Sequence, residues 1–458
     1  MSSYIVHGKH LSIPSFFQVY NYGGGNGDKD REIVYADLSK DTPKLINYYY
    51  ICNEYPHLFQ SKYFDDALNY DNIGDLFNDI RQKLIKDKCE VYKGYHIGNY
   101  DFKNDIFLLD SGAFNIIKKV AQTVGYDVAA FKQEIVSHMI RYYDFANSLK
   151  VDIVVGFDLG GKYTKKDQET NNKELSKFLA NIDVEELNNY LLEETIKYLS
   201  KKADYFPLVL ATVHGRNEEE FEINTKYILN LEHLYKYSFW GFALGGIAST
   251  KGLEQSWYDT INFSYIKKSR VKSAIAPGKA SRVVRNLVGK RPIHALGCGG
   301  YPNIVINYYC GATSFDAASP VRRVGDGNEE STHYIYSNYI PKSAKFSKYL
   351  IGGIKMNGKM LPGNCEYVEL NKVDDNYPLC GCYACQTISS VRNIKELYAM
   401  KSNDNEANYY SRQIMGLHAV NQHTKLCQII CDINNIDEFC DKYNNALNSD
   451  IKKLYHQL

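Results

Sequence analysis

Three aspartates stand at the ends of short apolar runs: Asp110 after "IFLL", Asp158 in "VDIVVGFD" and Asp316 in "ATSFDA". Unbroken apolar runs of this length are typical of parallel strands that are buried on both faces. The carboxyl ends of such strands meet at one end of a barrel, so we expect the three acids to lie together. Two neighbouring carboxylates can cleave a glycosidic bond, because one attacks the sugar while the other moves a proton. Taken singly, each acid would also fit as the cap of a following helix.

Cysteines cluster in "CGCYACQ" (380–386), which contains Cys380, Cys382 and Cys385. Thiolates two and three positions apart can wrap one tetrahedral zinc ion, so the spacing predicts a zinc site, with buried free thiols as the alternative. The residues alone leave the fourth ligand open between His418 and His423. Three further cysteines are also candidates for that position: Cys365, Cys427 and Cys431.

Apolar runs alternate with amphipathic stretches along most of the chain, which predicts about eight β/α units and an α/β fold of the TIM-barrel type. A doubly wound open sheet is the alternative architecture. We expect a catalytic barrel domain over residues 1–358. Residues 359–458 would then form an appended or inserted zinc-binding subdomain and C-terminal helices. The expected strands lie within 13–21, 33–51, 106–110, 151–158, 205–215, 239–246, 292–300 and 312–317.

The composition is that of a globular protein without a dominant charge. The net charge of the 458-residue chain is +1, so nucleic-acid binding would depend on a local patch. One basic stretch, 267–291, is either a solvated helix face or a strip that contacts phosphates. No apolar run is long enough for a membrane span, and the first residues lack the apolar core of a secretory signal. With 11 cysteines and no export signal, we expect a cytoplasmic location.

In order along the chain, seven motifs resemble those of the tRNA-guanine transglycosylase superfamily. They are "LLDSGAFN", "VDIVVGFD", "VHGR", "GFALGGIA", "RPIHALGCGG", "SFDAASPVRR" and "CGCYACQ". The resemblance covers about residues 105–425, with a looser similarity in "IPSFFQVYN" near the start. It implies an enzyme, a zinc-containing TIM barrel that exchanges a guanine base in a polynucleotide for a 7-deazaguanine base.

The resemblance also implies a role for each of the three aspartates. Asp316 matches the nucleophile that attacks C1′ of the sugar, expels guanine and holds a covalent aspartyl-glycosyl intermediate. Asp110 matches the general acid/base that serves the departing and incoming bases, and Asp158 matches the residue that reads the edge of the purine. The other matched base-binding positions are Ser111, Phe114, His214, Gly245, Gly246, Ile247 and Leu296, of which Phe114 and Leu296 would sandwich the base.

For the zinc site, counting from Gly416 in the family's pattern selects His423 over His418 as the fourth ligand beside the three cysteines. Four protein ligands leave no open coordination position, so the ion would be structural. Basic residues after the third aspartate and within 267–291 are expected to contact the phosphates that flank the target nucleotide. These residues are Arg322, Arg323, Lys279 and Arg282.

Two departures from the family pattern bear on the substrate. His214 stands where the family usually has Gln, and the Glu that ordinarily follows the "GG" turn is absent from "GGIASTKG". That Glu supports recognition of an aminomethyl substituent, so its absence favours the nitrile-bearing base preQ0. The pattern is most similar to the DNA-modifying 7-deazaguanine (DpdA-type) branch. DNA is therefore the favoured polymer, and tRNA, as in the queuine and archaeosine enzymes, is the alternative.

Family analogy extends to partners and host. It implies a homodimer or a helper protein, and a bacterial or phage-infected cell. A non-catalytic partner subunit of such an enzyme is a lesser alternative, which the presence of all three aspartates disfavours. A glycosidase acting on free carbohydrate is disfavoured by the "DSGAF" and cysteine motifs.

Overall fold

The structure of the protein is a computed structural model. It describes residues 3–20, 33–53, 70–87, 97–160, 177–178, 180–248, 253, 255–267, 269–318, 375–376, 382–390, 392–393, 396, 405–444 and 446–458.

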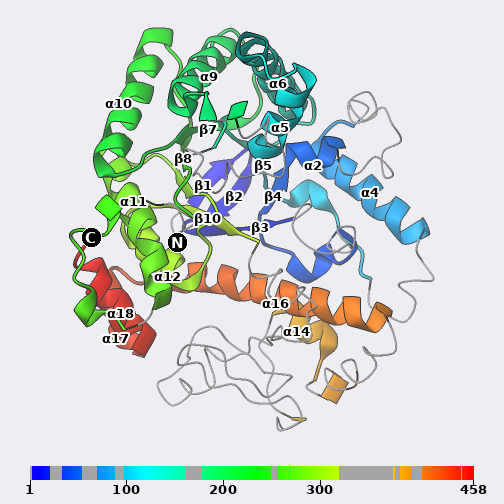
Figure 1. The fold of residues 1–458 in the computed structure, drawn as a ribbon. Helices are drawn as coiled ribbons and strands as arrows, with labels where there is room; N and C mark the ends of the chain where they lie inside the picture. The colour runs from blue at the N-terminus through cyan, green and yellow to red at the C-terminus, as the bar shows by residue number, and fades with distance from the viewer. Residues whose placement is uncertain are drawn as a thin grey trace.

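Eight parallel strands form a closed barrel in the order β10-β3-β4-β5-β6-β7-β8-β9 (Figure 1). Closure confirms the predicted α/β barrel of the TIM type over the open sheet. The second strand, β4, lies within 33–51 as expected. The strands are β3 (Ser15–Val19), β4 (Lys44–Asn47), β5 (Phe107–Asp110), β6 (Ile153–Val155), β7 (Leu208–Val213), β8 (Gly241–Leu244), β9 (Ile293–Ala295) and β10 (Ser314–Ala317).

Helices surround the barrel, and several begin at residues whose side chains cap them. Asp127 accepts a hydrogen bond from the backbone N–H of Ala130 at the start of α6, and Asn217 accepts one from Glu220 at the start of α10. No helix within the described part of the chain combines the length and apolarity that crossing a bilayer requires. The helices that follow strands are α2 (Tyr48–Asn53), α4 (Ile73–Asp87), α5 (Ala113–Thr123), α6 (Val128–Ser148), α9 (Val184–Leu199), α10 (Glu218–Tyr235), α11 (Ile275–Val288) and α12 (Tyr301–Tyr309).

Side chains alternate along each strand between the interior of the barrel and the helices outside it. In β4 and β5, Leu45 and Leu108 belong to the interior cluster, whereas Ile46 and Leu109 pack in the outer core. The same alternation continues to the carboxyl ends of the strands. It therefore decides which of the last residues face the open end of the barrel.

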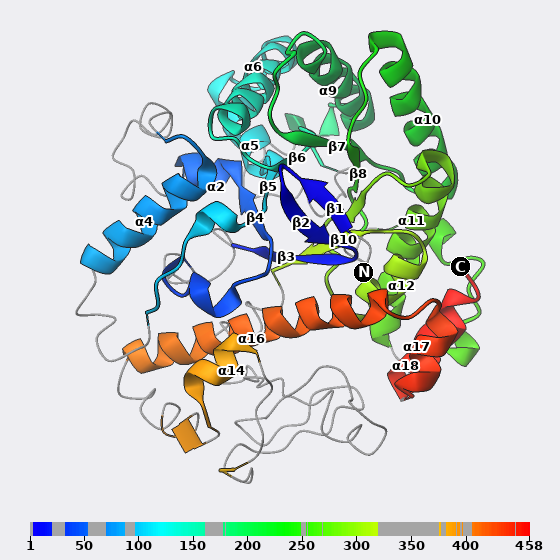
Figure 2. The same cartoon turned by 180° about the vertical axis from the view of Figure 1, so that it is seen from behind.

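A β-hairpin closes the amino-terminal end of the barrel (Figure 2). It consists of β1 (Ser3–Val6) and β2 (Lys9–Ser12), and its Val6 and Leu11 side chains join the interior cluster. Lys9 Nζ lies 3.1 Å from the Asp152 carboxylate, which directly precedes β6. A site can therefore form at the opposite, carboxyl-terminal end of the barrel, where the aspartates lie.

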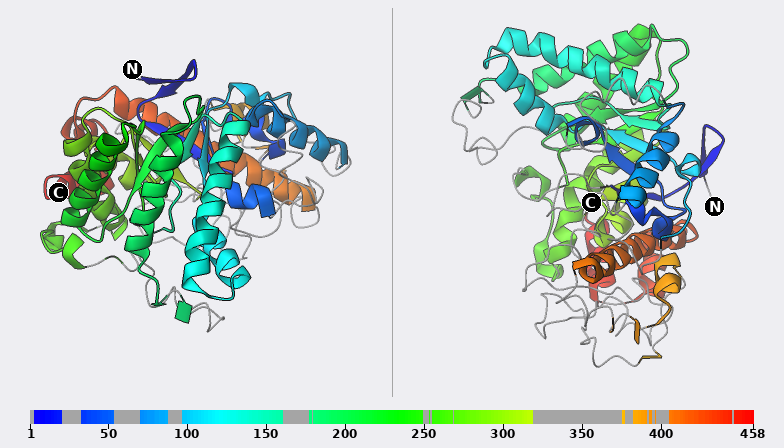
Figure 3. Two further views of the ribbon diagram at one scale, coloured as in Figure 1. Left: turned by 90° about the horizontal axis from the view of Figure 1, so that it is seen from above. Right: turned by 90° about the vertical axis from the view of Figure 1, so that its right-hand side faces the viewer.

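The C-terminal helices complete the ring. They are α14 (Tyr383–Ile388), α16 (Asn405–Cys431), α17 (Ile436–Lys442) and α18 (Ala446–Tyr455). The long helix α16 runs along the outside of β3 (Figures 1 and 3). There the Asn421 amide donates a hydrogen bond to Leu38 O at 2.8 Å, and the ring of His423 packs 4.8 Å from that of Phe16. The domain boundary predicted at 358/359 lies outside the described residues.

Replacing Phe16 with alanine tests how far the barrel depends on α16. The Phe16 side chain is 1% exposed, so its removal would leave a cavity between β3 and the helix. We expect Phe16→Ala to lower the free energy of unfolding by about 3–5 kcal/mol in urea titrations. The matched control is Ile5→Ala, which removes a side chain that is 58% exposed and should change stability by about 0.5 kcal/mol or less. Equal effects of the two substitutions would contradict this packing.

Candidate active site

The structure brings the three aspartates to the open end of the barrel. Asp110 is the last residue of β5, Asp316 lies in β10, and Asp158 follows β6 by three residues. Burial raises the pKa of Asp110 to about 7, and the charges of Asp158 and Asp316 contribute to the rise. The carboxylates are therefore close enough to act on one another.

Asp110 is oriented by the neighbouring strand and by the turn that follows it. Its Oδ2 accepts hydrogen bonds from Asn47 Nδ2 at 2.8 Å and from the Gly112 N–H at 3.2 Å. Asn47 is the residue directly opposite Asp110 in the β4–β5 pairing, which explains the contact. With a pKa near 7, this carboxyl group can both donate and accept a proton at neutral pH.

Asp316 is held through one of its two carboxylate oxygens. Oδ1 accepts a hydrogen bond from the Gly297 N–H at 2.7 Å and lies 3.2 Å from His294 Nε2. Gly297 adopts a φ of +69°, a conformation that favours glycine, in the turn that follows β9. Oδ2 receives no hydrogen bond from any described residue, so it is the oxygen available to react.

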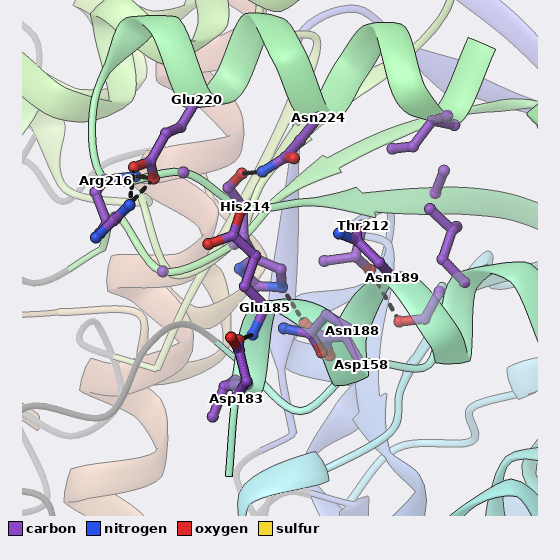
Figure 4. Close-up of a pocket in the computed structure, with 18 of the residues that line it drawn as sticks. Asp158, Asp183, Glu185, Asn188, Asn189, Thr212, His214, Arg216, Glu220 and Asn224 are labelled. Atoms are coloured by element: carbon purple, nitrogen blue, oxygen red, sulfur yellow. Dashed lines mark hydrogen bonds and ion pairs between the residues drawn. The ribbon is translucent and has the colours of Figure 1, made fainter. Parts of the chain in front are cut away.

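Asp158 pairs with His214, the histidine that follows β7 (Figure 4). Two contacts fix the position of this histidine. Asn224 donates a hydrogen bond to its backbone carbonyl at 2.7 Å. The ring also lies against Gly245, where a Cβ atom would collide with it. The Nδ1 atom of the same ring is buried and, among the described residues, has no hydrogen-bond partner.

A cavity of about 770 Å³ opens beside this pair, between the ends of β6, β7 and β8 and the helices α9 and α10 (Figure 4). Its wall includes Asp158, Asn188, His214, Arg216 and Gly246. Its volume is in the range of sites that bind small molecules. The cavity has mixed character, since apolar side chains of the two helices, such as Leu192 and Ile228, also line it.

Most of the other predicted base-binding residues also lie at carboxyl ends of strands. Ser111 is buried directly after β5, and its hydroxyl has no partner among the described residues. Ile247 is buried after β8, and half-buried Leu296 directly follows β9. Phe114 lies in the first turn of α5. Contact of these residues with a base stays a prediction.

Two of the residues expected to contact phosphates make contacts within the fold. Lys279 is 2% exposed, and its ammonium group lies 2.9 Å from the Glu218 carboxylate of the neighbouring helix. The Arg282 guanidinium lies 5.1 Å from the ring of Tyr455 in α18, and its side chain is half-buried. Contact of either residue with a phosphate stays a prediction. The remaining two predicted contacts, Arg322 and Arg323, lie outside the described residues.

A cluster that could hold a metal ion joins α14 to α16. Its members are Cys382, Cys385 and His418, whose ligand atoms all lie within 4.8 Å of one another. His418 Nδ1 is 3.2 Å from Cys382 Sγ and 3.1 Å from Cys385 Sγ. Two thiolates and an imidazole are a donor set that metal ions of the zinc type prefer. The predicted third cysteine, Cys380, lies outside the described residues.

The choice of His423 as the metal ligand is corrected to His418. The two histidines are five positions apart in α16, which places them about 140° apart around the helix. His418 faces the cysteines, whereas His423 Nδ1 lies 2.7 Å from the backbone oxygen of Ala419 and its ring packs on Phe16. His423 therefore helps to seat α16 on the barrel.

Two residues that contact the aspartates, Asn47 and His294, were not among the site residues predicted from the sequence. Asn47 ends a strand that the sequence defined poorly, so its pairing with Asp110 could not be inferred. His294 lies within the apolar run 292–300 and contacts Asp316. A titratable residue inside an otherwise apolar strand is the signal that could have found it, because such a group needs a buried partner.

No protein-family model matches the chain, and no curated protein matches it. Three features of the site bear on its chemistry. They are one carboxyl group that titrates near neutral pH, one carboxylate with an available oxygen, and a cavity beside a third carboxylate.

Substitution of the two histidines in α16 distinguishes the metal ligand. We expect purified His418→Ala protein to lose most of its bound metal, because it removes one of the three clustered donors. His423→Phe is the matched control, since it keeps a ring against Phe16 but cannot bind a metal ion. Mass spectrometry of the purified proteins should find about one ion per chain in the control. Metal loss in His423→Phe but not in His418→Ala would show that His423, as predicted from the sequence, is the metal ligand.

The raised pKa of Asp110 makes stability depend on pH. Since the pKa in the folded protein is about 7 and the ordinary value is 3.8, the protonated form favours folding. This contribution is complete below about pH 4 and is lost as the pH rises through about 7. Asp110→Asn, which stays neutral, should equal the wild type near pH 4 and exceed it near pH 8 by up to about 4 kcal/mol.

Urea unfolding of both proteins at the two pH values measures this difference. Asp204→Asn, at an exposed turn, controls for the removal of one negative charge. A constant difference between Asp110→Asn and the wild type across the range would contradict the raised pKa.

Proposed function

We propose that the protein is a transglycosylase that exchanges a guanine base in DNA for a 7-deazaguanine base through a covalent intermediate on Asp316. One observation carries the proposal: three carboxylates meet at the open end of the barrel, where the pKa of Asp110 is about 7. Base exchange with a covalent intermediate needs an ionised nucleophile and a separate group that moves a proton. Asp316 and Asp110 suit these two duties.

The reaction would proceed in two displacements. In the first, Asp316 Oδ2 attacks C1′ of the nucleotide, the bond from C1′ to the guanine nitrogen breaks, and protonated Asp110 donates a proton to the departing base. In the second, ionised Asp110 takes a proton from the incoming base, whose nitrogen attacks C1′ and releases Asp316. The proton of Asp110 is thereby restored. A pKa near 7 suits both steps, since the same group acts first as an acid and then as a base.

Asp158 and His214 would bind the exchanged base beside the cavity. A carboxylate accepts hydrogen bonds from the N–H groups on the edge of guanine, and Gly245 and Gly246 line the cavity beside Asp158. The 7-substituent has no acidic partner at the position where the aminomethyl-binding family members have Glu. The nitrile-bearing base preQ0 therefore fits this chain better than an aminomethyl base.

DNA is the proposed polymer, with tRNA as the alternative that the experiment tests. The preference depends on the two departures from the tRNA pattern, His214 and the missing Glu after the glycine turn. In either polymer the target guanine has to leave its stack before its C1′ can reach Asp316 at the mouth of the barrel. Arg322 and Arg323 are the proposed contacts to the flanking phosphates.

We further propose that the Cys382, Cys385 and His418 cluster binds zinc together with Cys380. The donor set fits, because thiolate and imidazole ligands are those of structural zinc sites. Zinc would supply structural cross-linking rather than chemistry, since four protein ligands leave no position for a substrate. The cluster would then hold α14 against α16, which itself packs on β3.

Incubation of the protein with duplex DNA or tRNA and preQ0, followed by mass spectrometry of the digested nucleosides, tests the proposal. We expect deazaguanine in DNA, and a covalent adduct of protein and DNA when the incoming base is omitted. Asp316→Asn should reduce both to background, because it removes the nucleophile and leaves the shape of the side chain. Glu219→Gln, an exposed acid in α10, is the matched control and should retain both signals.

If deazaguanine is found in tRNA and not in DNA, tRNA is the substrate and the DNA proposal is wrong. An adduct that persists in Asp316→Asn would remove Asp316 from the role of nucleophile. If neither polymer gains deazaguanine, base exchange by this chain is excluded, and the partner-subunit alternative takes its place.

A further inference from the structure

His294 is a fully buried histidine directly beside the candidate nucleophile. Its side chain is 0% exposed, and both ring nitrogens have partners. Nε2 lies 3.2 Å from Asp316 Oδ1, and Nδ1 lies 2.9 Å from the Ser314 hydroxyl. The ring of Phe17 packs edge-on against it at 5.5 Å. No part of the two-displacement reaction above uses this residue.

The strand pairing places the three polar residues in one line inside the barrel. His294 is paired with Ser314 in the β9–β10 register, and Asp316 lies two residues further along β10. Residues two apart in a strand point to the same side, so Ser314 and Asp316 both face the interior. The imidazole ring spans the distance between them. This arrangement is a consequence of the strand register and does not depend on a loop.

Hydrogen-bond donors and acceptors fix the protonation of the ring. An ionised Asp316 has no proton, so its Oδ1 can only accept, and His294 Nε2 has to carry the hydrogen. In the neutral ring Nδ1 is then an acceptor, and the Ser314 hydroxyl has to donate to it. Asp316 therefore selects the tautomer in which His294 donates to it, and the Ser314 hydroxyl satisfies Nδ1 in that tautomer. Without the hydroxyl, Nδ1 would be a buried acceptor that has lost its donor, and the ring would be held at one nitrogen only.

We propose that His294 is a positioning residue for the nucleophile, and that Ser314 holds the His294 ring in place by donating to Nδ1. Together with the Gly297 N–H, His294 holds Asp316 Oδ1, which leaves Oδ2 directed at the sugar. The role of the oriented carboxylate depends on the proposed function. The tautomer itself is a property of the folded chain and can be measured without a substrate.

Nitrogen NMR of protein labelled with ¹⁵N-histidine tests the tautomer. In the wild type, the His294 resonances, assigned by their loss in His294→Phe, should show a protonated Nε2 and an unprotonated Nδ1. In Ser314→Ala Nε2 should stay protonated, because Asp316 still accepts from it, but the Nδ1 resonance should shift because it loses its donor. Ser314→Thr, which keeps a hydroxyl, should retain the wild-type Nδ1 shift. A wild-type ring that carries its hydrogen on Nδ1, or on both nitrogens, overturns the proposal whether or not the protein is active.

Kinetics of base exchange test the effect on the nucleophile. We expect His294→Phe to lower kcat about 10- to 100-fold, the size of one hydrogen bond to a charged group, with KM changed less than about twofold. Ser314→Ala removes a hydrogen bond to a neutral ring and should lower kcat by less, about 2- to 10-fold. Ser314→Thr should recover kcat. A merely structural role would instead change the melting temperature and KM together.

The two proposals fail in different ways. An inactive wild type with the expected tautomer contradicts base exchange but leaves the hydrogen-bonded line of Ser314, His294 and Asp316 intact. An active wild type whose kcat is unchanged in both Ser314→Ala and His294→Phe overturns the positioning role.

Discussion

Closure of the barrel between β10 and β3 is the constraint on which the candidate site depends. The Ser15 N–H donates to Thr313 O at 3.0 Å, and Asp316 stands opposite Phe17 in the pairing of the two strands. If this pairing were absent, β10 would be the edge of an open sheet and its carboxylate would be far from β5. Because the ring is closed, residues from its first and last strands share one opening. The helix α16 packs outside β3, so the C-terminal region supports the strand pair that positions Asp316.

Crowding of negative charge is the second organising feature. Three carboxylates meet in a partly buried space, and each of them has different hydrogen-bond donors around it. Asp316 receives donors from a backbone N–H and a histidine, and Asp158 is paired with a histidine. The donors to Asp110 among the described residues, Asn47 and Gly112, are neutral. Burial, together with the charges of Asp158 and Asp316, raises the pKa of Asp110 to about 7. In the proposed reaction, these different surroundings would suit Asp110 to move a proton and Asp316 to attack the sugar.

The sequence was sufficient for features that depend on one strand at a time. Each of the three aspartates ends an apolar run, so their meeting followed once a barrel was expected. Features that depend on how two elements dock could not be inferred. Whether His418 or His423 meets the cysteines depends on which face of α16 rests on β3. The ion pair of Lys279 with Glu218 could not be inferred either, because it joins two different helices. His294 was hidden because its partner is on a neighbouring strand.

The hairpin of β1 and β2 fills one end of the barrel. With Val6 and Leu11 inserted into the interior cluster, the described residues close the amino-terminal end, so a molecule would reach the aspartates from the opposite side. In the proposed exchange of one base for another, entry and exit would then use the same route. The outgoing base would have to clear the pocket before its replacement arrives, while the polynucleotide stays attached to the protein. The two bases would therefore compete for one form of the enzyme, and released guanine would slow its own replacement.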